Sequence, residues 1–233
     1  MQRSTLLNLF DALYRHYGPQ HWWPAETTFE VMVGAILTQG VAWRNVETAI
    51  AELHRAGLVD PFALYHVPED VLSGHIRAAL YYRAKARKLK AMAALLVEQW
   101  DGALTRFFAR PTPVVRADLL HVWGIGPETA DAMLLYAGHH PVFVVDAYTR
   151  RVFGRLGWIT GRESYDDVQR AVTAALDPDV RLFNEFHALL DRLAKDACRA
   201  RRPACSVCPV ADSPLLACPG VPHDSKEATL RRH

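Results

Sequence analysis

Apolar residues recur at helical spacing along almost the whole chain, and this periodicity limits the fold more than any other feature. Trp43, Val46, Ile50 and Leu53, for example, follow one another at intervals of three or four residues, which places them on one face of a helix. The segment 141–145, PVFVV, is the only run typical of a strand, and a single run of this length does not make a sheet. The sequence therefore predicts an all-α fold.

Prolines, glycines and capping residues mark the ends of the expected helices. Two short helices are expected to begin near Pro61 and Pro68. In the helix over 84–100, apolar residues form one stripe, and we expect its basic residues to face outward. The longer expected helices cover residues 29–37, 43–56, 84–100, 114–122, 127–137, 147–156, 164–176 and 181–194.

The chain has 233 residues and a formal net charge of +2, which fits one large or two small globular domains. Its apolar runs are much shorter than the ~20 residues that cross a bilayer. Polar residues interrupt the first eighteen residues, unlike a secretory signal. We therefore expect a cytoplasmic protein.

Basic residues gather in two places although the net charge is small. The stretch between Asp70 and Glu98 contains no acidic residue. Such clusters fit a polyanion bound against one face, although ordinary solvated helix faces have a similar composition. The clusters comprise Arg77, Arg83, Lys85, Arg87, Lys88 and Lys90, and, near the C-terminus, Lys195, Arg199, Arg201 and Arg202.

All four cysteines, Cys198, Cys205, Cys208 and Cys218, lie in the last 36 residues. A chain that is long enough to bury a core has little need of a two-disulfide staple, so clustered thiols favour a metal site. One close pair with two outlying cysteines fits a four-cysteine iron–sulfur cluster at least as well as a zinc ion. The spacing alone leaves both metals open.

The segment Trp123-Gly124-Ile125-Gly126 connects two amphipathic helices, and Pro127 opens the second. Glycines allow a tight turn and close approach of a partner, and free backbone N–H groups at such a turn can hold one DNA phosphate. The alternative is an ordinary corner between two helices, in which Gly124 and Gly126 serve only the turn.

Asp146 follows the apolar run 142–145 and precedes an expected helix. This position is typical of a helix N-cap. A carboxylate at such a position can also stabilise the oxocarbenium-like sugar that forms when a base leaves deoxyribose, and can orient or deprotonate a water molecule.

These features together resemble the helix-hairpin-helix base-excision DNA glycosylases, specifically their endonuclease III-like branch. The residues that carry the resemblance are GIGPETA (124–130), Asp146 eighteen residues after Glu128, and the four late cysteines. The resemblance covers about residues 20–218. It implies two helical domains: a six-helix barrel over 20–130 that includes the hairpin, and a domain of residues 1–19 with 131–233 that carries a [4Fe-4S] cluster. It also implies a monomer that flips a damaged base out of double-stranded DNA.

The resemblance assigns roles to several other residues. Gln39 matches the glutamine that fills the gap left by the flipped base, and Tyr81 lies near the second wedge position. Arg199, Arg201 and Arg202 match a loop that meets the DNA backbone. Gln39 could instead be an ordinary polar residue at a helix end. Tyr81 could instead be an aromatic residue of the core.

Two tryptophans resemble the pocket of the relatives that excise 3-methyladenine and other alkylated purines. Trp23, in HWWP (21–24), and Trp43 could stack on a cationic alkylated purine. Both could equally be core residues, and we expect Trp22 to be one.

Glu128 stands where bifunctional endonuclease III enzymes carry the lysine that forms a Schiff base with the sugar. A glutamate cannot form an imine, so the departure implies hydrolysis by water and little or no strand cleavage. Glu128 can also simply favour the helix dipole. A second departure is the last cysteine interval of nine residues, where the endonuclease III pattern has five, although a longer loop costs little free energy.

Other functions remain open at this point. An endonuclease III-type enzyme would act on oxidised pyrimidines with weak or no lyase activity. A non-catalytic protein would bind DNA lesions without releasing a base. A zinc-stabilised helical module would bind DNA without an iron–sulfur cluster.

Overall fold

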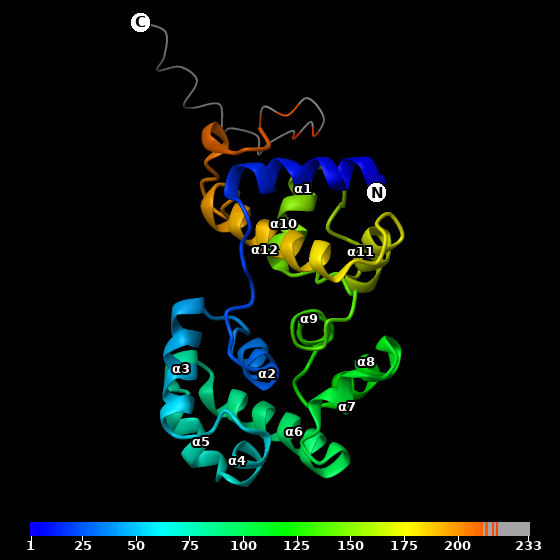
Figure 1. The fold of residues 1–233 in the computed structure, drawn as a ribbon. Helices are drawn as coiled ribbons and strands as arrows, with labels where there is room; N and C mark the ends of the chain where they lie inside the picture. The colour runs from blue at the N-terminus through cyan, green and yellow to red at the C-terminus, as the bar shows by residue number, and fades with distance from the viewer. Residues whose placement is uncertain (212, 214–215, 217, 219–233) are drawn as a thin grey trace, which may run out of the picture. The chain divides into compact units, whose positions relative to one another are not determined.

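The computed structural model describes residues 1–211, 213, 216 and 218. It is helical, and no strand occurs among these residues, which confirms the all-α prediction. Residues 141–145 are extended without belonging to a sheet. The chain forms two compact units, residues 23–142 and residues 1–22 with the described residues from 143 onward. Figure 1 labels their longer helices. The boundaries between the two units lie after residues 22 and 142. The sequence predicted boundaries after residues 19 and 130.

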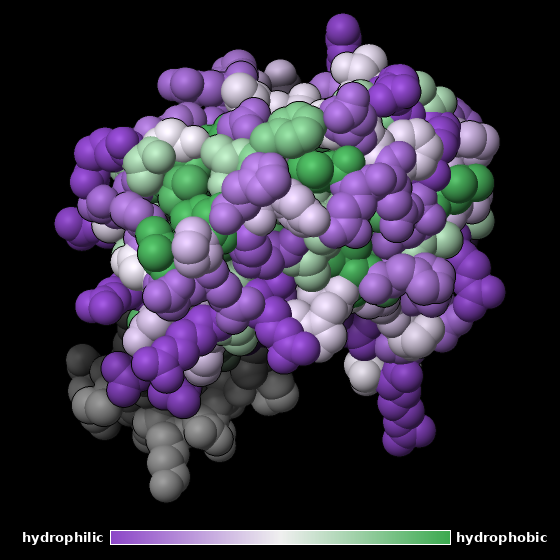
Figure 2. Space-filling view, turned by 90° about the horizontal axis from the view of Figure 1, so that it is seen from below, coloured by the Kyte–Doolittle hydropathy of each residue, from purple (hydrophilic) through white to green (hydrophobic). Residues whose placement is uncertain are grey.

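No helix in the described part of the chain is long and apolar enough to cross a membrane. On the face shown in Figure 2, hydrophobic side chains form small groups that are separated by hydrophilic ones. That face is therefore mainly hydrophilic, and most of the large apolar side chains lie in the core.

The unit of residues 23–142 is built around α2 (Thr28–Leu37), which is apolar on nearly every side. Helix α2 packs against α3, α6 and the π-helical segment η2, so its residues Met32, Val33 and Ile36 are fully buried. The Thr27 side chain accepts a hydrogen bond from the Glu30 amide at 3.1 Å and begins the helix. The other elements are α3 (Trp43–Arg55), α4 (Pro61–His66), α5 (Glu69–His75), η1 (Arg77–Ala79), α6 (Tyr82–Trp100), α7 (Leu104–Phe108), α8 (Thr112–His121), α9 (Pro127–Ala132) and η2 (Met133–Ala137).

The other unit joins the two ends of the chain. Helix α12 packs against α1 and α10, and α1 buries Leu6, Leu9 and Leu13 on one face. The rings of Phe10 and Phe186 lie 5.8 Å apart across the contact of α1 with α12. The elements are α1 (Arg3–Tyr17), α10 (Ala147–Arg155), α11 (Tyr165–Thr173), α12 (Val180–Asp196) and the short η3 (Cys205–Val207).

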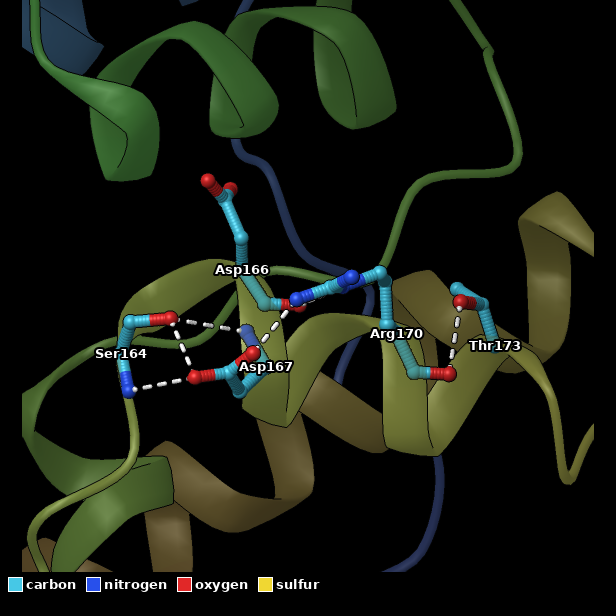
Figure 3. Close-up of polar contacts among 5 residues, drawn as sticks. All are labelled: Ser164, Asp166, Asp167, Arg170 and Thr173. Carbon is cyan, nitrogen blue, oxygen red and sulfur yellow. Dashed lines mark hydrogen bonds and ion pairs between the residues drawn. The ribbon is translucent and has the colours of Figure 1, made fainter.

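A capping box begins α11, as Figure 3 shows. The Asp167 amide donates to Ser164 Oγ at 3.1 Å, and the Ser164 amide and hydroxyl donate to Asp167 Oδ2 at 3.1 and 2.7 Å. The side-chain hydrogen bond from Ser164, followed by its backbone bond, lowers the pKa of Asp167. The start expected at Ser164 is thereby confirmed, but α11 ends at Thr173, three residues before the expected end.

The expectation that all basic residues of α6 face outward is wrong. Lys85 is only 2% exposed, and its Nζ donates to the carbonyl oxygens of Leu37 and Ala79, both at 2.7 Å. These carbonyls end α2 and η1, where backbone acceptors have no helical partner. Lys85 lies on the apolar stripe of α6 with Leu89 and supplies the missing donors. The Lys85 ammonium can be buried because it is hydrogen-bonded.

We predict that Lys85→Met lowers the free energy of unfolding by about 2 kcal/mol or more. Two buried carbonyls lose their donor, at ~1–3 kcal/mol each, partly offset by relief from burying a charge. Urea denaturation measures the change. Arg83→Met, an exposed cation on the same helix, should change stability by less than ~0.5 kcal/mol; an equal loss in both variants would contradict the role of Lys85.

The pH dependence of stability in the wild type and in Lys85→Met tests the burial of Lys85. Burial, followed by repulsion from Lys88, lowers the pKa of Lys85 from 10.5 to about 8. Between pH 8 and 10.5, Lys85 binds more protons in the unfolded chain than in the folded one. Its contribution to the free energy of unfolding therefore rises with pH and is lost as the pH falls towards 8. The stability difference between the wild type and Lys85→Met should therefore widen from pH 8 to 10.5, and a constant difference would contradict the burial of the charged lysine.

Candidate functional site

Asp146 is the N-cap of α10, as its position in the sequence predicts. Its Oδ1 accepts a hydrogen bond from the Thr149 amide at 2.7 Å, and 16% of its side chain is exposed. The cap keeps the carboxylate at the positive end of the helix dipole, which favours its negative charge. Because one oxygen serves as the cap, Oδ2 is the oxygen that is available for chemistry.

His187, on α12, is the residue at this site that the sequence analysis missed. Its Nε2 lies 3.7 Å from Asp146 Oδ2, and 12% of its side chain is exposed. An imidazole at this distance can orient the carboxylate or hold a water molecule between the two groups. The signal in the sequence was a histidine one position after the buried Phe186, on the strongly amphipathic α12.

The turn between α8 and α9 has the expected hairpin form. Gly124 has a φ of +82°, and a Cβ atom there would lie 2.6 Å from the Lys88 side chain. Both observations require glycine at this position. Gly126 has an ordinary φ of −97°, and a Cβ atom there would meet nothing within 4 Å. A phosphate-binding role for Gly126 stays a prediction.

Gln39 lies against this turn. Its Nε2 donates to the Gly124 carbonyl at 3.3 Å and to Thr129 Oγ1 at 2.9 Å, and its Oε1 accepts from Lys88 Nζ at 2.5 Å. The Gln39 amide thus connects the hairpin both to the end of α2 and to Lys88 of α6. Its expected role as a gap-filling residue stays a prediction.

Tyr81 is a surface residue and not a core aromatic residue. It is 75% exposed, and it follows Leu80 in a pair of left-handed residues with φ values of 49° and 44°. Such backbone is unfavourable for residues other than glycine and is often found where function requires it. The wedge role of Tyr81 stays a prediction.

The structure brings Trp23 and Trp43 together with a third aromatic residue. The rings of Trp23 and Trp43 are 5.4 Å apart and nearly perpendicular at 84°, and Tyr136 lies 5.4 Å from Trp23. A Cβ atom at Gly34 would be 3.0 Å from the Trp23 indole, so this glycine provides the room for the ring. Both tryptophans are partly exposed, whereas Tyr136 is buried. The sequence analysis did not single out Tyr136, because this residue lies in the apolar segment Met133–Ala137, where it resembles any core residue.

Glu128 is exposed in the first turn of α9, where a negative charge favours the helix dipole. Within the same hairpin, Arg116 of α8 donates to the fully buried Asp131 at 2.7 and 3.1 Å. This ion pair connects the two hairpin helices.

The four cysteines converge. All are partly buried, and the pKa of the Cys208 thiol is raised by burial first and then by the nearby Cys198, Cys218 and Cys205. Four soft sulfur donors in one place fit an iron–sulfur cluster or a zinc ion. The Arg155 Nη1 donates to Cys198 Sγ at 3.1 Å.

Two family models match this chain. A model of the HhH-GPD superfamily of base excision DNA repair proteins matches residues 33–178, and a model of the iron–sulfur binding domain of endonuclease III matches residues 198–213. The first match spans more than half of the chain.

The chain belongs to the HhH-GPD superfamily of base excision DNA repair proteins.

Related proteins extend over most of the chain. A protein of Methanocaldococcus jannaschii with the provisional name DNA repair glycosylase is 40% identical over 210 residues, which cover 89% of this chain and 94% of that protein. The endonuclease III of Thermotoga maritima is 24% identical over 187 residues, 77% of this chain and 79% of that protein.

Solved structures show the same fold. A non-covalent complex of endonuclease III with DNA aligns with a TM-score of 0.77 at 21% identity, over 94% of this chain and 95% of the other. The 3-methyladenine DNA glycosylase of H. pylori, bound to 1,N6-ethenoadenine, aligns with a TM-score of 0.69 at 25% identity, over 84% and 98%. Together with the family model and the M. jannaschii relative, this fold makes the chain a helix-hairpin-helix DNA glycosylase similar to endonuclease III.

In this glycosylase the cofactor is a [4Fe-4S] cluster and not the alternative zinc ion. Two arginines of α10 hold the segment that carries it. Arg155 donates to the carbonyls of Arg199 and Ala200 at 2.8 and 3.2 Å, besides its bond to Cys198 Sγ. Arg151 donates to the carbonyls of Cys198 and Ala194 at 2.8 and 2.9 Å.

The loop between the first two cysteines presents the expected basic residues. Arg201 and Arg202 are exposed, and Arg202 has a left-handed φ of 51°. Arg199 is also exposed, and its Nε donates to the Asp196 carbonyl at 2.9 Å. The DNA contact of these three residues stays a prediction.

We predict that Arg155→Met weakens retention of the cluster, because the variant removes the donor to Cys198 Sγ and to two loop carbonyls. Visible absorption of the purified protein should be lost several-fold faster in the presence of a chelator. Arg162→Met, an exposed arginine of the same unit, is the matched control. Equal rates of loss in the wild type and in Arg155→Met would contradict the stabilising role of this arginine.

Proposed function

We propose that this glycosylase hydrolyses the bond between a damaged base and its deoxyribose, with Asp146 as the catalytic carboxylate and water as the nucleophile. The observation that carries the proposal is the position of Asp146. A helix N-terminus and Thr149 hold the ionised carboxylate, while Oδ2 remains beside His187 in a partly exposed place.

In the proposed reaction the C1′–N bond of the flipped nucleotide breaks, and its electron pair leaves with the base. The sugar becomes oxocarbenium-like, and the negative charge of Asp146 stabilises it. Water forms the new C1′–O bond and gives its proton to the carboxylate or to solvent. His187 acts as a positioning residue for the carboxylate. The products are a free base and an abasic site in an uncut strand.

Glu128 supports this monofunctional outcome. A lyase reaction of the endonuclease III type requires an amine that forms an imine with the sugar, and a carboxylate has no such chemistry. The exposed place of Glu128 in the first turn of α9 is explained by the helix dipole. We therefore assign the chemistry to Asp146 alone.

We propose alkylated purines as the substrate class. Trp23, Trp43 and Tyr136 form a group of aromatic rings in which two faces lie nearly at right angles. Electron-rich rings attract a purine that carries a positive charge, and alkylation also weakens the glycosidic bond. The H. pylori 3-methyladenine DNA glycosylase, at 25% identity, supports this assignment.

Oxidised pyrimidines are the second candidate substrate class. The relatives named endonuclease III in Thermotoga maritima and other organisms favour it. The aromatic group favours the purines, because a flat cation gains more from stacking than a saturated, non-planar ring does.

The remaining assignments concern DNA binding. We propose that Arg199, Arg201 and Arg202 contact phosphates and that Gln39 and Tyr81 occupy the space left by the flipped base. Cys198, Cys205, Cys208 and Cys218 would hold the [4Fe-4S] cluster, which supports the basic loop and takes no part in breaking the bond. We expect a monomer.

We predict that Asp146→Asn lowers base release by at least ~10³-fold while binding to the same duplex changes little, because the variant keeps the cap and removes the charge. Single-turnover base release and fluorescence anisotropy measure the two effects. Asp179→Asn, an N-cap of α12 in the same unit, is the control that should keep full activity. Base release by Asp146→Asn at the wild-type rate would rule out the proposed role.

A panel of duplexes tests substrate and reaction type together. Duplexes with an alkylated purine should release the base and break only after heat or alkali treatment, and borohydride should trap no protein–DNA adduct. Release restricted to oxidised pyrimidines would favour the second candidate. A borohydride adduct would contradict the assignment of Glu128, and binding without release of any base would indicate a non-catalytic lesion-binding protein.

A further inference from the structure

Two carboxylates and an imidazole that the proposed reaction does not use come together in the unit of residues 23–142. Glu26 lies in the segment just before α2, Glu30 in the first turn of α2, and His54 in the last turn of α3. Helices α2 and α3 pack against each other, as Figure 1 shows. One possible metal-binding atom of each side chain lies within 4.8 Å of the other two. The fold therefore gathers three donor groups of the kind that bind metal ions.

Glu30 is the fixed member of this group. Its side chain is only 7% exposed, and its Oε2 lies 3.2 Å from His54 Nε2. The same oxygen accepts a hydrogen bond from the Glu26 amide at 3.0 Å. In the part of the chain that the structure describes, the other oxygen, Oε1, accepts no hydrogen bond. A buried carboxylate needs compensating partners, so this oxygen leaves Glu30 with room for one more.

Glu26 and His54 complete the group from the solvent side. Both are exposed, and the Glu26 carboxylate forms no hydrogen bond or ion pair with another described residue. Two carboxylates at this distance repel each other, and a protonated His54 would balance only one of the two negative charges. A divalent cation would balance both.

The distances in this group suit zinc. In a tetrahedral site with bonds of about 2.0–2.2 Å, neighbouring donor atoms are ~3.3–3.6 Å apart. The 3.2 Å between His54 Nε2 and Glu30 Oε2 is close to this value, and the exposed Glu26 side chain can approach by a change of rotamer. The imidazole favours zinc over magnesium and calcium, which bind through oxygen ligands.

We propose that Glu26, Glu30 and His54 bind one Zn²⁺ ion, with water as the fourth ligand, in what we call the α2–α3 site. The bound ion would hold the segment before α2 to both helices. Trp23 lies three residues before Glu26, so the ion would also restrict the part of the chain that carries this ring. The site is separate from the iron–sulfur cluster and independent of the proposed reaction.

Equilibrium dialysis of the full-length protein, with its cluster in place, against Zn²⁺ tests the α2–α3 site. Zinc and iron are both measured, so that zinc taken up by cysteines that have lost the cluster is recognised. The wild type should bind one zinc ion at unchanged iron content, and excess Mg²⁺ should not displace it. Glu26→Gln and His54→Gln should each lower the affinity ~10-fold or more, because losing even an outer-shell partner of a ligand costs about 10–100-fold.

The variants are chosen to keep the fold. Glu26→Gln preserves the size of an exposed side chain, and His54→Gln retains an N–H donor towards Glu30. Glu47→Gln on α3 and His66→Gln on α4 remove an exposed carboxylate and an exposed imidazole of the same unit and should keep the wild-type affinity. Wild-type affinity in both site variants, an equal loss in the controls or displacement by Mg²⁺ would overturn the proposal. A wild type without bound zinc would leave the contact of His54 with Glu30 as an ion pair between two helices and would equally overturn it.

Thermal unfolding gives a second measurement of the same site. An ion that binds only the folded chain raises its melting temperature. Saturating zinc should therefore raise the melting temperature of the wild type and of Glu47→Gln, and should leave that of Glu26→Gln unchanged. The same rise in the wild type and in Glu26→Gln would contradict the role of Glu26 as a ligand.

Discussion

Helix α10 is held at both ends, and the position of the Asp146 carboxylate depends on this constraint. At its N-terminus, Asp146 caps the helix and is the carboxylate that we propose as the catalytic group. At its C-terminal half, Arg151 and Arg155 donate to the carbonyls and the Cys198 sulfur of the iron–sulfur segment. One nine-residue helix therefore connects the cofactor segment with the carboxylate.

The two units present different kinds of side chain. The unit with α10 provides charge: a carboxylate beside His187 and a loop with exposed arginines. The unit with the hairpin provides aromatic surface and cations: Trp23 with Trp43, and Lys88 against the turn. In the proposed reaction, the sugar needs a negative charge, and the base and backbone need stacking and positive charge.

Two buried polar contacts hold helices of the hairpin unit together. Lys85 donates to two terminal carbonyls, and Arg116 with Asp131 closes the hairpin. Terminal backbone groups are the ones that lack helical partners, so long polar side chains reach them from neighbouring helices. These contacts set the positions of α2, α6, α8 and α9 within their unit.

The sequence by itself determined the local features: the helical class, most helix ends, the cap at Asp146, the turn at Gly124 and the cysteine set. Each depends on residues close together in the chain, through periodicity, capping and backbone preference. Only the tertiary structure decided that Lys85 is buried, that His187 lies beside Asp146, that Tyr136 joins Trp23, and that Lys88 covers Gly124. The physical reason is that, apart from the bond of Lys85 to Ala79, these contacts join residues more than 35 positions apart. Helical periodicity identifies a buried face without identifying what packs against it.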